Sequence, residues 1–442
     1  MSDLLAPFPS SCDVVVLGGG ASGTSIAYQL AKRGVDVLLL EAGDIAQGAS
    51  GRNGGLLDTA VDPGSPLVDY YYRSAELWPR LAEELLDTAG IDVEYFRSGT
   101  LQVVLEGDTD KDEIDAEFRG HLEQGYDVRW LDREQTLALS PLFPEDTLGG
   151  WLRPMDGQVN PIMLCYALAL GTARHGGRVR QGTPATALLV QTPGGLVAAE
   201  PRHYPGVTGA HSAGGGATGS AAAPTGGHAA PGGDAAPEGR SPAPTGRIVG
   251  VRTPEGDVLC DQIVVALEPW TRPFLAPLGL DVPVRPQRGQ IFVTEPLPPL
   301  MEVACLYGVD PYIYWRQTRH GGLTIGGARP QDTHGDFLLE SVSAATTLDI
   351  QRIVLGMAAR VHPALSDTAI IRWWGGVMGF TEDLLPVLGR LEEHPNVVTA
   401  CGFCPNGILC APLTGRVIAD VVVGEEPEVP LEAYARRRFA AD

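Results

Sequence analysis

The chain has 442 residues, more than one simple hydrophobic core accommodates, so we expect two interleaved domains or one large α/β unit with a second layer. Its net charge of −22 at pH 7 disfavours nucleic acid and anionic membranes as partners, because phosphates would be repelled over most of the surface. The first residues lack a basic start followed by an apolar stretch, and no run approaches the ~20 apolar residues of a membrane span, so we predict neither a signal peptide nor a span.

The first predicted elements form a βαβ unit. Residues 12–18 are an unbroken apolar run, typical of a strand buried on both faces. The glycine-rich turn that follows leads into a predicted helix over 24–34, whose apolar residues fall on one face and which Gly34 closes. A second buried strand is predicted over 35–43.

The middle of the chain alternates loops, helices and strands up to an unusual insertion. The predicted elements are a glycine-rich loop at 48–57, helices at 66–89, 109–126 and 160–177, a strand at 99–107, and one or two strands at 177–192. Gly, Ala and Pro dominate residues 205–247, and such a segment buries too little apolar surface to offset its chain entropy, so we predict disorder there. It lies between two strand-like runs, which indicates a hairpin with an expanded loop that serves as a tolerated surface insertion.

The pattern after the insertion indicates a discontinuous nucleotide domain. We predict strands at 261–270, 288–296, 311–317, 321–329, 370–380 and 396–403, and helices at 337–361 and 406–425. Parallel-type strands lie towards both ends of the chain and antiparallel material lies between them. We therefore assign residues 10–90, 158–282 and 370–442 to the nucleotide domain, and 91–157 and 283–369 to an inserted substrate domain.

The turn after the first strand has the spacing of a dinucleotide site. Gly18 allows the tight turn, Gly20 lets a pyrophosphate approach the backbone, and Gly23 lets the helix and strand pack closely. The helix N-terminus supplies N–H donors and a positive dipole for the phosphates. Glu41 ends the second strand, where its carboxylate can accept ribose hydroxyls and would repel the 2′-phosphate of NADP. This motif leaves the choice between NAD and FAD open.

Seven cysteines, an odd number scattered along the chain, argue against a secreted disulfide framework and favour a reducing, cytoplasmic location. Cys401 and Cys404 form a CxxC pair, for which a redox or metal role is the alternative to simple packing. No second CxxC or histidine cluster completes a zinc site, so we predict no metal.

An ordered set of motifs resembles one enzyme family. The set comprises the N-terminal unit, SGRNGG, DQIVVALEPW, RGQ, YIYWRQTRHGGLTIGGAR, GFTEDLLPVLG and GFCPNGILCAPLTG. It resembles the FAD-dependent D-amino acid oxidase superfamily, which includes glycine oxidase, sarcosine oxidase and related amine oxidoreductases, over nearly the whole chain outside 205–247. The resemblance implies an α/β fold, with a discontinuous FAD-binding Rossmann-like domain of the GR2 type and an inserted antiparallel-sheet substrate domain.

The resemblance also implies FAD-binding residues. The ADP half would be held by the N-terminal turn and the second strand, the pyrophosphate by SGRNGG, the adenine by the backbone after a turn proline, and the flavin pyrimidine by a helix N-terminus near the C-terminus. These residues are Gly18, Gly20, Ala21, Ser22, Gly23, Glu41, Ala42, Ser50, Gly51, Arg52, Asn53, Gly54, Gly55, Ala185, Asn406, Gly407, Ile408 and Leu409. Met378 stands where the sarcosine oxidase branch has its flavin-linking cysteine, so we expect non-covalent FAD.

The implied reaction oxidises the C–N bond of an amine or amino acid, with hydride transfer to the flavin N5 and hydrolysis of the imine. The two arginines of glycine oxidase fall at Met378 and Pro405, which leaves Arg316 and Arg329 as candidate carboxylate ligands, each with a structural role as the alternative. Tyr312 matches an active-site tyrosine of glycine oxidase, with packing as its alternative.

Several points stay open at this level. Leu267 and Glu268 stand where the relatives have a small Ala-Gly turn. The arginine and asparagine of SGRNGG resemble those of oxidoreductases that act on polyamine derivatives and similar amines, which implies a secondary or extended amine as substrate. Neither Lys32 nor Lys111 is placed to activate oxygen, so the sequence does not decide between an oxidase and a dehydrogenase. The electron acceptor is therefore O2 or another oxidant. The alternative functions are a flavin-binding subunit or scaffold without turnover, and an NAD-dependent dehydrogenase. The substrate and the oligomeric state are not specified.

Overall fold

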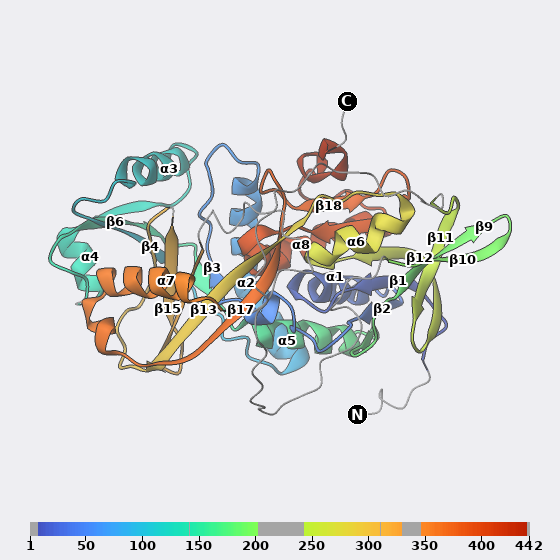
Figure 1. The fold of residues 1–442 in the computed structure, drawn as a ribbon, viewed down its shortest axis with the longest axis horizontal. Helices are drawn as coiled ribbons and strands as arrows, with labels where there is room; N and C mark the ends of the chain where they lie inside the picture. The colour runs from blue at the N-terminus through green and yellow to red at the C-terminus, as the bar shows by residue number, and fades with distance from the viewer. Residues whose placement is uncertain (1–7, 141, 202–242, 310, 329–345, 440–442) are drawn as a thin grey trace, which may run out of the picture.

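The computed structural model describes residues 8–140, 142–201, 243–309, 311–328 and 346–439. Two large sheets organise these residues, with nine strands in the right half of Figure 1 and eight strands in the left half. Residues 205–242 of the segment predicted to be disordered lie outside the described residues. The last residue of that segment, Arg247, already begins a strand, so the predicted boundary extends slightly too far.

The N-terminal βαβ unit forms the middle of the nine-stranded sheet. Strand β1 (Ser11–Leu17) and β2 (Val37–Leu40) are parallel neighbours joined by helix α1 (Ala21–Lys32). On its other side β1 pairs in parallel with β12 (Gly256–Val265), which pairs in parallel with β19 (Val397–Cys401). Strands far apart in the sequence thus share one parallel sheet, as the prediction of a discontinuous domain requires.

Further strands complete this sheet on both sides. Strand β8 (Arg178–Arg180) lies beyond β2, and β18 (Val387–Arg390) pairs with β19. Strand β11 (Arg247–Thr253) joins β12 to β9 (Ala187–Thr192) in antiparallel pairing, as predicted for the strands that flank the insertion. Strand β10 (Gly195–Ala199), which forms a hairpin with β9, was not predicted as a separate element.

The eight-stranded sheet is mainly antiparallel, in the order β17-β13-β16-β15-β14-β4-β6-β5. Its strands are β4 (Thr100–Leu105), β5 (Arg129–Asp132), β6 (Thr147–Arg153), β13 (Arg285–Pro296), β14 (Ala304–Tyr307), β15 (Tyr312–Gln317), β16 (Gly322–Ala328) and β17 (Ile370–Phe380). Because β17 pairs with β13 along almost its whole length, the predicted domain boundary at residue 370 is wrong for this strand. A two-stranded sheet of β3 (Leu56–Leu57) and β7 (Gly157–Gln158) is separate from both.

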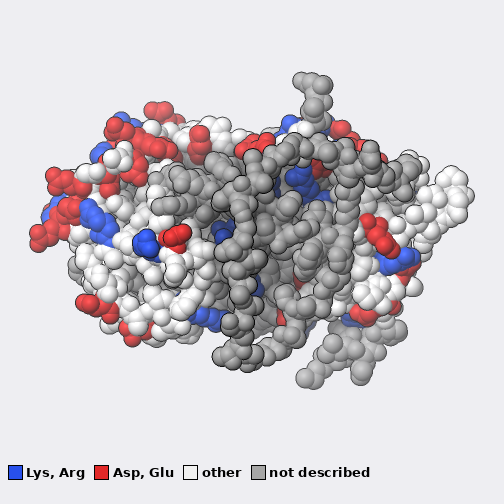
Figure 2. Space-filling model, viewed as in Figure 1, with Lys and Arg blue, Asp and Glu red and all other residues white. Residues whose placement is uncertain are grey.

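Among the residues that the structure describes, three helices belong to the eight-stranded half, namely α3 (Lys111–Glu123), α4 (Arg133–Leu139) and α7 (Leu348–Val361). The predicted helix 337–361 therefore begins later than expected within the described residues, and its first part, 337–345, lies outside them. Figure 2 shows Asp and Glu side chains gathered with fewer Lys and Arg along the rim of this half, in keeping with the net charge of −22.

A layer of buried helices covers the parallel strands. It consists of α1, α2 (Leu67–Ala89), α5 (Pro161–Arg174) and α8 (Gly407–Val423), with the short α6 (Thr271–Leu275) elsewhere on the same sheet. Pro412 lies inside α8, where a proline removes one backbone donor and disturbs the helical hydrogen bonds. Ser74 Oγ and Trp78 Nε1 of α2 both donate to the carbonyl of Leu409, which ties the two helices together at this turn.

By length and composition, one stretch of the described residues, Cys404–Val423, is apolar enough to cross a membrane. It includes α8, whose side chains are mostly buried against α1 and α2. Burial inside the protein accounts for this apolar character, because a core helix of a globular protein passes the same compositional test.

Candidate functional site

The glycine turn after β1 brings three backbone segments into contact. Gly18 has φ +108°, and a Cβ atom at this position would lie 2.3 Å from the carbonyl oxygen of Ala266 in the loop after β12. A Cβ at Gly23 would lie 2.0 Å from the carbonyl oxygen of Gly18, so helix α1 packs directly on the turn. Gly20 is the N-cap residue of α1, which leaves the first N–H groups of the helix pointing towards a ligand position.

Glu41 lies directly after β2, beside this turn. Its carboxylate accepts hydrogen bonds from the N–H of Gly19 at 2.6 Å and from the N–H of Gly43 at 2.8 Å. Its backbone pairs with Arg180 and Thr183, which brings the segment containing Ala185 to the same edge of the sheet. Ala42 is exposed next to Glu41. The acid is thus held rigidly at the carboxyl end of the parallel strands, where α/β sheets bind nucleotides.

The SGRNGG loop runs across the N-terminus of α1. Ser50 begins the 3-10 turn η2 (Ser50–Arg52), and its Oγ accepts a hydrogen bond from the N–H of Ala21 at 2.9 Å. Arg52 Nη1 donates to the carbonyl of Gly375 at 3.1 Å, and Trp374 Nε1 donates to the carbonyl of Arg52. These bonds link the loop to β17, so the same loop contacts helix α1 of the nine-stranded half and a strand of the eight-stranded sheet.

Arg316 fixes this loop and does not reach the cavity described below. Its Nε donates to the carbonyl of Gly54 at 2.5 Å, Nη1 donates to Oε1 of Gln158 at 2.9 Å, and Nη2 donates to the carbonyl of Val159 at 3.3 Å. The side chain is buried, and burial lowers its pKa to about 10. These contacts favour the structural alternative for Arg316, and its candidate role as a carboxylate clamp stays a prediction.

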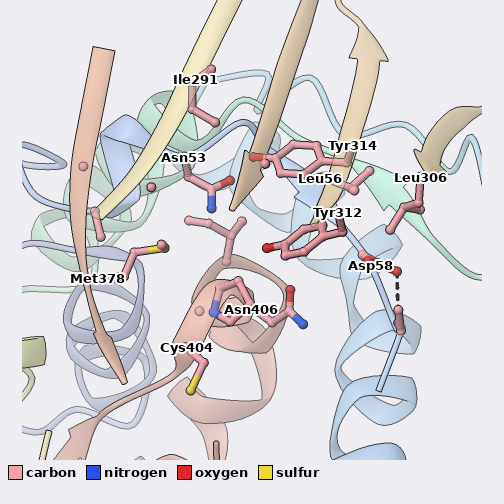
Figure 3. A pocket seen from close by; sticks show the side chains of 18 of the residues that line it. Asn53, Leu56, Asp58, Ile291, Leu306, Tyr312, Tyr314, Met378, Cys404 and Asn406 are labelled. Atoms are coloured by element: carbon pink, nitrogen blue, oxygen red, sulfur yellow. Dashed lines mark hydrogen bonds between the residues drawn. The ribbon is translucent and has the colours of Figure 1, made fainter. Parts of the chain in front are cut away.

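Helix α8 begins at the opposite side of the loop. The turn η7 (Cys404–Asn406) precedes it, and Asn406 is its N-cap residue, followed by Gly407, Ile408 and Leu409 in the first turn. Like α1, this helix presents first-turn N–H groups that have no acceptor within the helix, together with the positive end of its dipole. Figure 3 shows Cys404 and Asn406 at the base of a pocket whose upper wall carries Tyr312 and Tyr314.

This pocket is a cavity of about 330 Å³ between the two sheets. Predicted residues that line it are Ala21, Ser22, Ser50, Arg52, Asn53, Tyr312, Met378, Asn406, Gly407 and Ile408. Glu41 and Ala185 lie at the far edge of the parallel sheet, beside the turn. Arg329 lies outside the described residues. The N-terminus of α1, the N-terminus of α8 and one face of the antiparallel sheet thus line the same cavity.

Tyr312 and Tyr314, which we call the tyrosine wall, do not release their protons at neutral pH. Burial, reinforced by the carboxylate of Asp58, raises the pKa of Tyr312 to about 12. Burial raises the pKa of Tyr314 further still. Both hydroxyls therefore keep their protons and can act as hydrogen-bond donors towards a bound molecule.

Glu268 was noted in the sequence only as a departure, and the structure places it on the cavity wall. It has φ +49°, in the left-handed region that is strained for a residue with a side chain. Its Oε2 accepts from the N–H of Gly402 at 3.2 Å, and burial raises its pKa to about 7. The sequence feature that could have identified this residue is a charged side chain that closely follows the buried strand β12.

Three further charged residues of the cavity escaped the sequence reasoning. Asp58 follows β3, Glu117 lies on α3, and Arg153 ends β6. They are separated in sequence and share no motif. The one available signal was an arginine at the end of an otherwise apolar strand, "LGGWLR".

The residues present fit a flavin dinucleotide. The glycines at 18 and 23 let the turn, α1 and the loop after β12 pack without a clash, and the N-termini of α1 and α8, from opposite ends of the chain, both line the cavity. Glu41 offers acceptors at one end, while a cavity bounded by the tyrosines lies at the other. These features define a dinucleotide-binding oxidoreductase with a separate substrate-side wall.

The comparisons with known proteins place the chain more closely. The family model described as FAD dependent oxidoreductase (DAO) matches residues 13–228 and 238–421, and the chain belongs to this family. It is 27% identical over 432 residues to glycine oxidase from Geobacillus kaustophilus, covering 96% of this chain and 97% of that protein. It is 26% identical over 440 residues to a subunit of opine oxidase from Agrobacterium tumefaciens, covering 97% of this chain and 98% of that protein.

A solved structure confirms the fold class. The crystal structure of the Geobacillus kaustophilus glycine oxidase superposes with a TM-score of 0.78, at 24% identity, over 98% of this chain and 100% of that one. The predicted α/β fold and the predicted FAD dependence are therefore confirmed, and the alternative of an NAD-dependent dehydrogenase is excluded by the family. The assignment of individual residues to FAD or substrate stays a prediction.

Proposed function

We propose that this protein oxidises the C–N bond of an amine or amino acid with FAD as the oxidant. The cavity carries this proposal, because it is bounded by the glycine turn and the α8 N-terminus on one side and by the tyrosine wall on the other. The glycine oxidase and opine oxidase relatives support a substrate with a CH–NH2 or CH–NH group. When bound, FAD accepts a hydride and so supplies the redox chemistry.

In the proposed reaction a neutral amine would lose the hydrogen on its α-carbon as hydride, which bound FAD would accept. The resulting imine reacts with water to give a carbonyl compound and the released amine or ammonia. The chain's own residues mainly position the substrate. Tyr312 and Tyr314, which stay protonated, can donate hydrogen bonds to it, and the α8 N-terminus stabilises negative charge that develops at its end of the cavity.

The proposed FAD ligands are those predicted from the sequence, and we further propose that FAD is bound without a covalent link. Met378 lines the cavity, and its thioether cannot form the bond that a cysteine forms. Denaturation in guanidinium followed by filtration should release all flavin into the filtrate. Flavin that stays with the denatured chain would contradict this assignment. A cytoplasmic location is also proposed, supported by seven cysteines that are all unpaired in the structure.

Anaerobic reduction of the bound flavin tests the proposed function. Amines and amino acids, including secondary amines, would be added to the purified yellow protein, and bleaching of the flavin absorbance would be recorded. Free FAD with the same amines serves as the control for non-enzymatic reduction. A flavin that dithionite bleaches but no amine bleaches would overturn the proposal and favour a scaffold without turnover.

A further inference from the structure

One end of the cavity is built from charged side chains of three separate elements. Arg153 Nη2 donates to Oε1 of Glu117 at 2.6 Å, and Arg153 Nη1 lies 3.6 Å from Oδ1 of Asp58. The second distance is too long for a hydrogen bond. Ile114 and Phe118 of α3 line the same end and supply an apolar wall.

Arg153 is buried with two donors unused. Only 1% of its surface is exposed, and Nε and Nη1 have no hydrogen-bond partner among the described residues. Its guanidinium lies 4.2 Å from the ring centre of Phe118. This cation–π contact stabilises the positive charge, but the ring gives the N–H groups at the edge of the guanidinium no acceptor. The carboxylates of Glu117 and Asp58 favour the charged form and raise the pKa of Arg153 despite its burial. Buried donors without acceptors are rare in folded proteins and indicate a missing partner.

Asp58 is the second residue at this end with an unused polar atom. Two acidic side chains, Asp58 and Glu117, flank the single basic side chain of Arg153. Burial, reinforced by the nearby Asp58, raises the pKa of the neighbouring Asp156 to about 8, so that carboxyl is mostly protonated at neutral pH. Asp58 Oδ1 accepts from the N–H of Ala60, while Oδ2 has no donor among the described residues. Asp58 therefore has a carboxylate oxygen that can accept hydrogen bonds from a cationic group.

A single chemical group satisfies both observations. A carboxylate supplies the acceptors that Arg153 lacks, and an ammonium group supplies the donors that Asp58 lacks, so the bound pair adds no net charge to this end. These two groups occur together on one carbon in an α-amino acid. We propose that this end of the cavity binds the zwitterionic α-amino-acid group of the substrate, while the amine to be oxidised lies at the other end of an aliphatic chain. This inference rests on the proposed C–N oxidation and names its substrate class.

The test compares three sets of ligands on the flavin-loaded enzyme. L-ornithine and L-lysine carry the complete head group, putrescine and cadaverine lack its carboxylate, and the ω-amino acids of the same chain lengths lack its ammonium. Dissociation constants come from the perturbation of the flavin spectrum, which reports binding without turnover. At the better chain length, the diamino acid should bind at least tenfold tighter than both partial analogues, a factor equal to ~1.4 kcal/mol. The diamino acid should be oxidised at its ω-carbon, giving the ω-aldehyde and ammonia.

Two variants test separately the proposed contact of the ammonium with Asp58 and that of the carboxylate with Arg153. In Asp58→Asn, which leaves Arg153 in place, the diamino acid should lose its advantage over the ω-amino acid but keep part of its advantage over the diamine. In Arg153→Met the advantage over the diamine should disappear. Arg129→Met is the matched control, because Arg129 is an exposed residue of β5 paired with Asp127, and it should leave all dissociation constants unchanged. Flavin content and the thermal midpoint establish that each variant is folded, and Asp58→Asn still tests the inference if Arg153→Met is not.

The outcomes separate this inference from the proposed function. Equal binding of the diamine and the diamino acid, or no perturbation of the wild-type flavin by any of these ligands, overturns the amino-acid subsite. Oxidation at the α-carbon of the diamino acid overturns the proposed orientation. If other amines still bleach the flavin in these cases, the C–N oxidation stands without the subsite.

Discussion

Replacing Arg316 by methionine distinguishes the two roles that the sequence left open for this residue. The substitution keeps much of the side-chain volume and removes all donors. It leaves the carbonyls of Gly54 and Val159 buried without their partner, and it frees the side chain of Gln158. A buried polar group left unsatisfied costs roughly 1–3 kcal/mol, so the two carbonyls together predict a loss of about 2–6 kcal/mol in the free energy of unfolding.

The assay follows urea unfolding by tryptophan fluorescence and flavin retention on a desalting column. Because Arg316 anchors the loop that caps α1, Arg316→Met should both unfold at lower urea and lose FAD. The exposed Arg129→Met serves as the control and should stay within about 0.5 kcal/mol of the wild type. A variant as stable as the wild type, with full flavin but a weakened affinity for amino acids, would refute the structural role and restore the carboxylate clamp.

Three further predictions test other parts of the structure. Gly23→Val should abolish flavin retention, since its Cβ alone would lie 2.0 Å from the Gly18 carbonyl oxygen; a yellow variant with normal affinity would contradict the close packing of α1 on the turn. Burial lowers the pKa of His362 to about 4, so the folded state resists protonation between pH 6.5 and 4 and loses about 3 kcal/mol of stability as the pH falls through this range. His362→Phe should flatten that acid limb in unfolding curves measured from pH 7 to 4, and an unchanged limb would exclude His362 as its source. Burial raises the pKa of Glu268 to about 7, so the wild type loses about 3 kcal/mol as the pH rises from 4.5 through 7. Glu268→Gln should therefore gain stability relative to the wild type at pH 8 but not at pH 4.5, and equal differences at the two pH values would count against a buried titrating carboxyl.

Local signals in the sequence determined much of the nucleotide half. The apolar run before Gly18, the glycine spacing and the helical pattern that follows depend on neighbours within a few residues, so they specify β1, the turn and α1 directly. The same is true of Asn160, whose side chain caps α5 by accepting from the N–H of Met163, and of Gly424, which ends α8 with φ +81°. The ordered motifs were sufficient for the family and the cofactor.

Only the tertiary structure decided how distant charges are used. Arg316 and Arg153 are both arginines at the ends of apolar strands, and nothing local tells them apart. The folded chain gives Arg316 three protein acceptors, whereas Nε and Nη1 of Arg153, between Asp58 and Glu117, find no acceptor in the part of the chain that the structure describes. The assignment of β17 to the second sheet depended equally on its distant partner β13. Strand pairing and charge burial arise from contacts between residues far apart in the chain. The local sequence pattern that specifies a helix or strand therefore does not predict these contacts.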